Sequence, residues 1–108
     1  MTKRIELARE FSPFPFGRYP KHGPYNGERF RTEFLLPALA SGERVEVVLD
    51  GARGLSPSFL EEAFGGLVRA GIAADELRSR LIIVSNRDPS RKAEVERYIQ
   101  EQGARSAA

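Results

Sequence analysis

The distribution of apolar residues along the chain predicts three strands. In residues 3–9 apolar and charged residues alternate, which is typical of a short strand with one solvated face. Residues 44–50, RVEVVLD, give the clearest strand pattern, and Val48 adds burial of the second face near the end of the strand. Residues 81–85, LIIVS, are a continuous apolar run, which predicts a strand in the interior of a sheet.

Between the first two strands, apolar residues at helical spacing predict a helix over residues 27–42. Asn26 is placed to cap its start, and Gly42 is placed to end it. Pro37 lies inside this range, and a proline in a helix removes one hydrogen bond and crowds the preceding turn. We therefore expect a kink at Pro37, or only a loose final turn beyond it.

Three further helices are predicted in the second half of the chain. Residues 57–70 form a wide apolar face and end before a glycine, and residues 73–80 form a short helix. The last helix covers residues 88–103, where Asp88 is placed as its cap and Pro89 occupies its first position. Strands that alternate with helices in this way predict a small α/β layer with crossover helices. We expect one domain over residues 1–108, with its core in about 4–100 and a frayed tail in 104–108.

Composition limits the chemistry that the chain can carry. Its 108 residues are 41% hydrophobic and 30% charged, and a net charge of +2 is too small to argue for nucleic acid by itself. Cysteine is absent and histidine occurs once, so disulfides and thiolate chemistry are excluded and a zinc or iron site has almost no ligands. We expect no metal, no cofactor and no catalytic residue.

The same survey bears on location. No apolar run approaches the roughly 20 residues of a membrane span. The first ten residues, MTKRIELARE, carry charges where a signal peptide needs an apolar stretch. We therefore expect a cytoplasmic domain without a membrane partner.

Residues 10–27 carry four prolines, three glycines and several aromatic residues, which excludes a helix and indicates an ordered loop. Basic and aromatic side chains interleave in and after this loop, and such a pattern can hold phosphates and stack bases. The candidate anion or nucleic-acid ligands are Arg18, Tyr19, Lys21, Arg29 and Arg31. The alternative is a packed cover over one end of the sheet with solvated charges, and this alternative is favoured because no phosphate-binding or RNA-binding motif is present.

The stretch Ser56-Pro57-Ser58 opens the helix over residues 57–70. Ser56 as the cap places Pro57 at the first helical position, whereas Ser58 as the cap forms a capping box with Glu61. Either arrangement satisfies free amide donors, and capping explains both serines without any chemistry. The functional alternative is an exposed serine that is phosphorylated, since the helix dipole tolerates a phosphate at this end.

Two adjacent glycines, Gly65 and Gly66, lie inside this predicted helix. Each costs about 0.5–1 kcal/mol relative to alanine in a helix interior, so close packing within the fold or close approach of a partner should offset the cost. Internal packing is the favoured explanation. Glu61 and Glu62 are adjacent, so they point in different directions and do not form a general acid–base pair.

The stretches GRY, GERFR and SFLEEAFGGL together resemble the bacterial STAS-like domain of unknown function, over roughly residues 4–100. That family is related to STAS domains of sulphate transporters and anti-sigma factor antagonists. The resemblance implies a small mixed β-sheet with helices packed mainly on one face. It also implies a regulatory binding module, in which a serine at the start of the helix after a central strand is phosphorylated by a partner kinase.

In this sequence the corresponding candidate phosphorylation sites are Ser56 and Ser58, in LSPSF where the related proteins carry a motif close to Asp-Ser-Ser-Gly. We therefore expect a non-enzymatic protein-interaction module with a protein partner such as a kinase or anti-sigma-type regulator. The predicted docking residues are Arg53, Ser58, Glu61, Glu62, Gly65 and Gly66. The rival prediction is nucleic-acid or nucleotide binding by residues 18–31.

Overall fold

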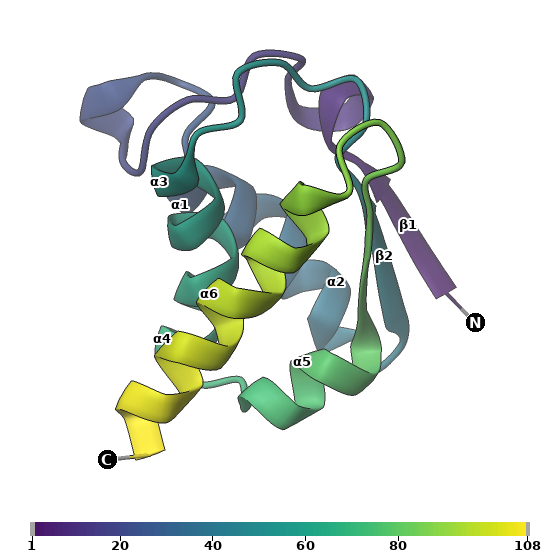
Figure 1. Cartoon of the computed structure of the whole chain (residues 1–108), viewed down its shortest axis with the longest axis vertical. Coiled ribbons are helices and arrows are strands. Elements are labelled where there is room, and N and C mark those ends of the chain that lie inside the picture. Colours follow the sequence, from purple (N-terminus) through teal and green to yellow (C-terminus); the bar gives the residue numbers. More distant parts are fainter. Residues whose placement is uncertain (1, 108) are drawn as a thin grey trace.

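A three-stranded sheet forms one layer of the fold in the computed structural model, which describes residues 2–107 with side chains through Arg105 (Figure 1). The strands are β1 (Thr2–Glu6), β2 (Arg44–Val48) and β3 (Leu81–Val84), in the order β1-β2-β3. Both pairs are parallel. The predicted α/β class is therefore confirmed, but the sheet over these residues is parallel and not mixed.

The position of β3 differs from its prediction as an interior strand, because β2 is central and β3 lies at an edge. The apolar run of β3 therefore does not reflect an interior position in the sheet. Ile83 points into the core and is buried, while Leu81, Ile82 and Val84 keep part of their surface exposed. A flanking helix on one side and the neighbouring strand on the other supply enough cover for apolar residues at an edge.

The first long helix is continuous over residues 27–40 and comprises α1 (Gly27–Phe30), η3 (Arg31–Leu35) and α2 (Leu36–Ala40). Pro37 neither ends nor breaks it. The middle segment η3 is a wide turn in which the amide of Leu36 donates to the carbonyl of Arg31, five residues back. Pro37 therefore follows a widened turn, where the hydrogen-bond ladder has already shifted.

The second long helix covers residues 57–69 as α3 (Pro57–Leu60), η4 (Glu61–Gly65) and α4 (Gly66–Arg69). The short helix α5 (Ala74–Arg80) leads into β3, and α6 (Ser90–Ala107) is the last helix. All three agree with the predicted helices. However, α6 continues through Gly103 to Ala107, so the predicted frayed tail is helical as far as the structure describes it; Ala108 lies outside the described residues.

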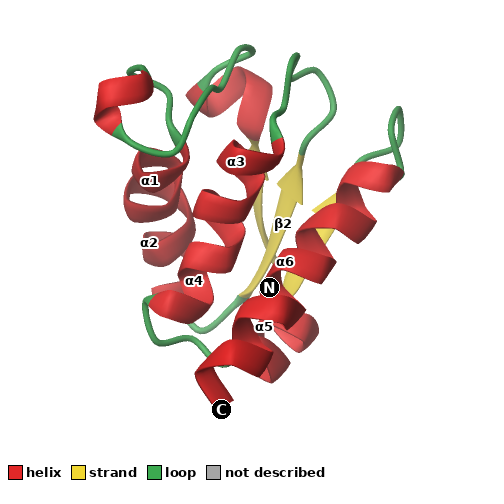
Figure 2. Ribbon diagram, turned by 60° about the vertical axis from the view of Figure 1, so that its left-hand side comes forward, coloured by secondary structure: helices red, strands yellow, loops and turns green. Residues whose placement is uncertain are grey.

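The helices cover mainly one face of the sheet, as Figure 2 shows. The paired residues Ile5, Val47 and Ile83 all lie on that face and are buried. On the other face, Arg4 pairs with Glu46 through an ion pair of 2.7 Å, and this face keeps polar side chains partly exposed. The chain therefore builds one core between the sheet and the helices that cover it, and α5 and α6 contribute Leu77, Val95 and Ile99 to that core.

The N-terminal strand is shorter than predicted and gives way to η1 (Leu7–Phe11), a wide helical turn. Leu7 and Phe11 are buried together at the i, i+4 spacing of a helical turn. Phe11 also contacts other rings, with centroids 5.1 Å from Phe30 and 5.4 Å from Tyr25. The turn therefore brings the start of the following loop onto the aromatic part of the core.

Within residues 2–107, no helix combines the length and the apolar character that crossing a membrane requires.

Candidate functional site

Three loops gather at the end of the molecule toward which the strands point (Figure 2). They cover residues 12–26, 49–56 and 85–89, and we call this surface the loop face. The first loop follows η1 and contains the short 3-10 helix η2 (Pro20–His22), so the expectation of no helix in residues 10–27 is wrong for one turn, in which Pro20 takes the first position. Arg53 donates its amide to the carbonyl of Pro13 at 2.8 Å, which joins the first loop to the second. In parallel α/β sheets, ligands bind outside the carboxyl ends of the strands, so this face is the first place to look for a site.

The helix start at residues 56–58 uses one of the two predicted caps. Ser56 is the cap, because its hydroxyl accepts from the amide of Phe59 at 3.2 Å and Pro57 takes the first helical position. Ser58 is already helical, and its hydroxyl lies 3.1 Å from that of Ser56. Glu61 does not close a capping box with Ser58, since its carboxylate binds two arginines.

Three of the predicted docking residues lie in the interior. Glu62, Gly65 and Gly66 are buried, and of residues 59–68 only Glu61 keeps appreciable exposure. The second long helix therefore presents no edge along its length for a partner. What remains of the predicted docking surface is the helix start, with Ser58 half-buried and Arg53 exposed beside it on the loop face.

Five charged side chains connect the second long helix to the first and to the loop. They are Arg18, Arg31, Arg69, Glu61 and Glu62, and we call them the arginine–glutamate cluster. Arg31 lies 2.8 Å from the Glu62 carboxylate and also donates to the Glu62 backbone carbonyl, with side-chain exposures of only 13% and 6%. Arg18 lies 2.5 Å and Arg69 2.8 Å from the Glu61 carboxylate. These contacts bring the sequence stretches GRY, GERFR and FLEEAFGG together.

The glycines of these stretches make room for the cluster. A Cβ at Gly66 would lie 2.1 Å from Nη1 of Arg31, and one at Gly65 would lie 2.6 Å from Oε2 of Glu61. At Gly27 a Cβ would lie 2.8 Å from the backbone carbonyl of Phe59. Internal packing, the favoured explanation for the glycine pair, therefore accounts for both Gly65 and Gly66.

The electrostatics of the cluster follow from its geometry. Burial acts to raise the pKa of Glu61, but hydrogen bonds from Arg69 and Arg18 outweigh it and lower the pKa. The hydrogen bond to Glu61 raises the pKa of both arginines. Glu61 therefore stabilises the ionised forms of Arg18 and Arg69, they stabilise its ionised form in turn, and the ion pair with Arg18 holds the loop against the helix.

The predicted nucleic-acid ligands are not brought together as a free basic surface. Arg18 and Arg31 belong to the cluster, and Arg29 lies 3.1 Å from Glu33 and donates to the carbonyl of Pro24 at 2.8 Å. Only Tyr19 and Lys21 of the predicted set are exposed in the loop without such a partner among the described side chains. His22 accepts from the amides of Arg18 and Tyr19 through Nδ1, so it shapes the loop.

Sequence reasoning missed the most exposed apolar side chains of the loop face. Phe14 is 63% and Phe16 is 60% exposed, and Tyr19 and Tyr25 are 40% and 41% exposed. The loop that carries them is ordered by the Phe16 amide donating to the Tyr25 carbonyl at 2.9 Å. The alternation Pro-Phe-Pro-Phe in residues 13–16 was a usable signal, because prolines at alternate positions stop the chain from folding its rings into a helix or a sheet.

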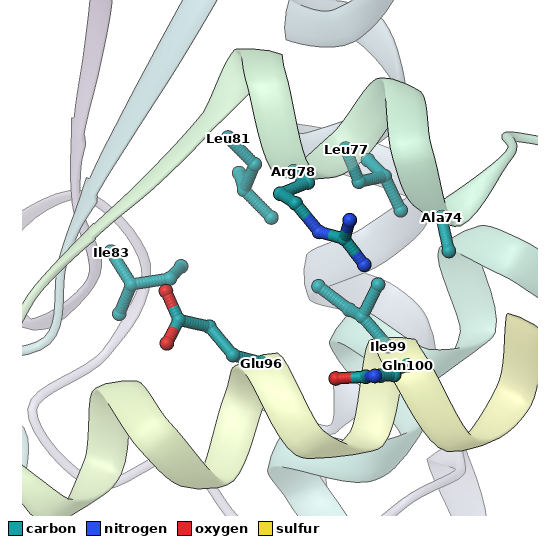
Figure 3. Close-up of a pocket in the computed structure, with 8 residues that line it drawn as sticks. All are labelled: Ala74, Leu77, Arg78, Leu81, Ile83, Glu96, Ile99 and Gln100. Atoms are coloured by element: carbon teal, nitrogen blue, oxygen red, sulfur yellow. The ribbon is translucent and has the colours of Figure 1, made fainter.

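A separate hollow of about 270 Å³ lies between α5, β3 and α6 (Figure 3). Its walls are mostly apolar, with Leu77, Leu81 and Ile99 among them and with Arg78 and Glu96 on its two helices. None of the predicted site residues lies there. Within the described residues, no group of three or more acidic or histidine side chains is placed to hold a metal ion.

The fold and the loop face define the class of the protein: a small parallel α/β domain that presents its exposed aromatic residues on loops at the carboxyl ends of its strands. The family model of the STAS-like domain of unknown function (DUF4325) matches residues 26–91, and the chain belongs to this family. The resemblance predicted from the sequence is thus confirmed. The match includes all of the arginine–glutamate cluster except Arg18. No curated protein and no solved structure matches the chain.

Proposed function

We propose that the chain is a non-enzymatic, cytoplasmic regulatory module that docks a protein partner on its loop face, in the manner of anti-sigma factor antagonists. The observation that carries this proposal is the exposure of Phe14 and Phe16 on an ordered loop. Exposed aromatic residues on a soluble domain mark interaction surfaces, and aromatic side chains are enriched at the centres of protein interfaces.

The anchoring of the loop supports the same proposal. Arg18 ties the loop to the second long helix, and the amides of Gly27 and Glu28 donate to the carbonyls of Gly17 and Arg18 at 2.9 Å each. A loop held in this way loses little conformational freedom when a partner binds, which favours affinity.

Regulation is assigned to Ser58. This serine lies at the border of the loop face, and Ser56 rather than Ser58 supplies the helix cap. Phosphorylation of Ser58 would add a charge of nearly −2 beside the docking surface while leaving the cap in place. Ser56 is the second candidate, but its modification would also change the cap.

Site-specific photocrosslinking in cells of the source organism tests the docking proposal. A photoreactive phenylalanine analogue replaces Phe14 or Phe16, and the control position is Arg44, an exposed residue at the start of β2 and so at the opposite end of the sheet. The expected result is one discrete protein adduct from positions 14 and 16, resistant to nuclease and absent from position 44. Equal labelling from all three positions, or adducts that disappear with nuclease, would contradict it.

The switch is tested in the same assay. Ser58→Glu is expected to change the adduct yield from position 16 severalfold, whereas Ser58→Ala is expected to leave it close to the unmodified level. Equal yields from both variants would remove the regulatory role of Ser58 and leave the docking surface untouched.

A further inference from the structure

An arginine-lined crevice of about 160 Å³ lies at the carboxyl ends of β2 and β3, between the loops that follow these strands. Arg53 comes from the loop that follows β2, Arg87 comes from the loop that follows β3, and Arg91 comes from the first turn of α6. The crevice is smaller than the roughly 300 Å³ at which pockets for drug-sized ligands begin. It can therefore receive one chemical group and not a whole large ligand.

Two of these arginines are available to a ligand. Among residues 2–105, no carboxylate lies within ion-pair distance of the Arg53 or Arg87 guanidinium groups, and both residues are exposed. Arg91 is already engaged, at 3.4 Å from Asp88 and 3.3 Å from Glu94. Most other arginines of the chain have carboxylate partners, so two without one on facing walls of the same crevice are a distinctive pair.

The two carboxylates that line the crevice already have hydrogen-bond or ion-pair partners. Asp50 accepts from the amides of Arg87 and Asn86 at 2.9 and 3.0 Å. These hydrogen bonds lower its pKa, and the charge of the Arg87 guanidinium, although beyond ion-pair distance, lowers it further. Asp88 accepts from the hydroxyl of Ser90 at 2.5 Å and faces Arg91. The Asp50 contacts also tie the two loops together, so Arg53 and Arg87 are mounted on walls whose spacing is fixed by the fold.

We propose that this crevice binds a phosphoryl group, as free phosphate or as a phosphate monoester, between Arg53 and Arg87. Guanidinium groups match the oxygen atoms of a phosphoryl group through pairs of charge-assisted hydrogen bonds. Two arginines from different loops can contact different oxygens of one tetrahedral anion. Arg91 is already paired with Asp88 and Glu94, so Arg53 and Arg87 supply the positive charge that an anion would meet in the crevice.

Two kinds of ligand could carry the phosphoryl group into the crevice. One is a small phosphate ester or phosphate itself, and the other is a phosphoserine carried by the docked partner. The second source rests on the proposed function, because the hydrogen bond between Arg53 and Pro13 links the crevice to the loop that carries Phe14 and Phe16. The site itself does not depend on it.

Titration followed by amide NMR shifts tests the site on the full chain. The probes are inorganic phosphate and a short phosphoserine peptide, each at pH 7.5 and at an ionic strength held constant with chloride. The expected result is saturable shifts at Gly51, Gly54 and Arg87. Because one charge-assisted hydrogen bond is worth roughly a tenfold change in affinity or more, Arg53→Gln and Arg87→Gln should each weaken binding by about tenfold or more. Arg44→Gln removes the same charge at the other end of β2 and should change binding less than about twofold.

The proposal is overturned if the shifts do not saturate, or if Arg44→Gln weakens binding as much as the crevice variants do. Tighter binding of the phosphoserine peptide than of inorganic phosphate and of the unphosphorylated peptide identifies a partner as the source. Equal or weaker binding identifies a free phosphate or small ester. Photocrosslinking at position 14 tests the docking proposal independently. A negative result for the phosphoryl site therefore does not contradict the docking proposal, and a negative result for docking does not contradict the phosphoryl site.

Discussion

Arginines take two different parts in this molecule. In the arginine–glutamate cluster, guanidinium groups are matched with carboxylates at 2.5–2.8 Å and one pair is almost fully buried. In the arginine crevice, Arg53 and Arg87 are exposed and face solvent without carboxylate partners among the described residues. Both groups lie next to loops that follow strands. The difference is whether the opposing wall of the fold supplies a carboxylate.

This comparison separates structural arginines from candidate ligand-binding arginines in one chain. A buried charge without a partner is strongly unfavourable, so the cluster is complete in itself and leaves no capacity for a ligand. An exposed arginine without a carboxylate partner costs the fold little free energy, because water solvates its charge. The stretches GERFR and FLEEAFGG, on which the resemblance was based, supply Arg31, Glu61 and Glu62 of the cluster, which explains why motif reasoning about function pointed at the interior.

The largest expected effect comes from breaking the buried pair. Glu62→Ala leaves the guanidinium of Arg31 buried without its carboxylate, and it should lower the free energy of unfolding by about 3–5 kcal/mol in urea titrations. Glu96→Ala on α6 serves as the control, because Glu96 is exposed, and it should change stability by less than about 0.5 kcal/mol. The double variant Arg31→Met with Glu62→Leu should recover most of the loss. A Glu62→Ala cost near that of the control would show that the pair is not structural.

The next effect concerns the space that Gly66 leaves for Arg31. Gly66→Ala places a methyl group against a guanidinium that is fixed by Glu62, and overpacking of this kind costs about 1–3 kcal/mol. In the background of Arg31→Met the same substitution should cost much less, and the gain in helix propensity should become visible. A double-mutant cycle in urea measures the coupling. Equal costs in both backgrounds would assign the glycine a role unrelated to Arg31.

A smaller effect is expected from pH. The pKa of Glu61 is lowered in the folded state from its ordinary value of 4.5, so its stabilising contribution is fully present above that pH. The contribution is lost as the pH falls below 4.5 through the lowered pKa. Because Glu61 is partly exposed, the loss should amount to less than about 1 kcal/mol. Glu61→Gln should reduce the difference between the free energies of unfolding at pH 7 and at pH 3 by this amount. If that difference is unchanged in the variant, Glu61 does not contribute to the pH dependence of stability.

The smallest effect on stability is expected at the crevice. Arg53→Gln and Arg87→Gln should each change the free energy of unfolding by less than about 0.5 kcal/mol, because neither guanidinium has a carboxylate partner to lose. Thermal and urea unfolding measure this. A loss of more than about 1 kcal/mol would place these arginines with the structural set and would end the contrast between the two regions.

Much of the fold follows from local patterns in the sequence. The strand over residues 44–48 and the helix over residues 57–69 follow from their own periodicity, and the caps at Asn26 and Ser56 use residues that the local rules name. The choice of Ser56 over Ser58 does not follow, because both schemes satisfy those rules. In the structure the Glu61 carboxylate binds Arg69 of the same helix and Arg18, which lies 43 positions away in the chain, and it does not form a capping box with Ser58.

The candidate site was less accessible to sequence reasoning, for two physical reasons. The sequence predicts that Gly65 and Gly66 pack closely, but the guanidinium that fills the space at Gly66 comes from Arg31 on the other long helix. The crevice needs the parallel order of β2 and β3, which sets Arg53 and Arg87 opposite each other. With a mixed sheet, as the resemblance implied, these two loops need not have met.

The order of strands in the sheet also has a consequence for how the protein is made. Since β1, β2 and β3 lie side by side in the order of synthesis, the neighbour of each new strand has already emerged from the ribosome when that strand is made. Thr2 of β1 pairs with Arg44 once β2 has been synthesised, and Val45 of β2 pairs with Leu81 once β3 has been synthesised. No strand has to be inserted between two others that are already paired. The sheet can therefore grow at one edge during translation, and each intervening helix is complete before the strand that follows it must pair.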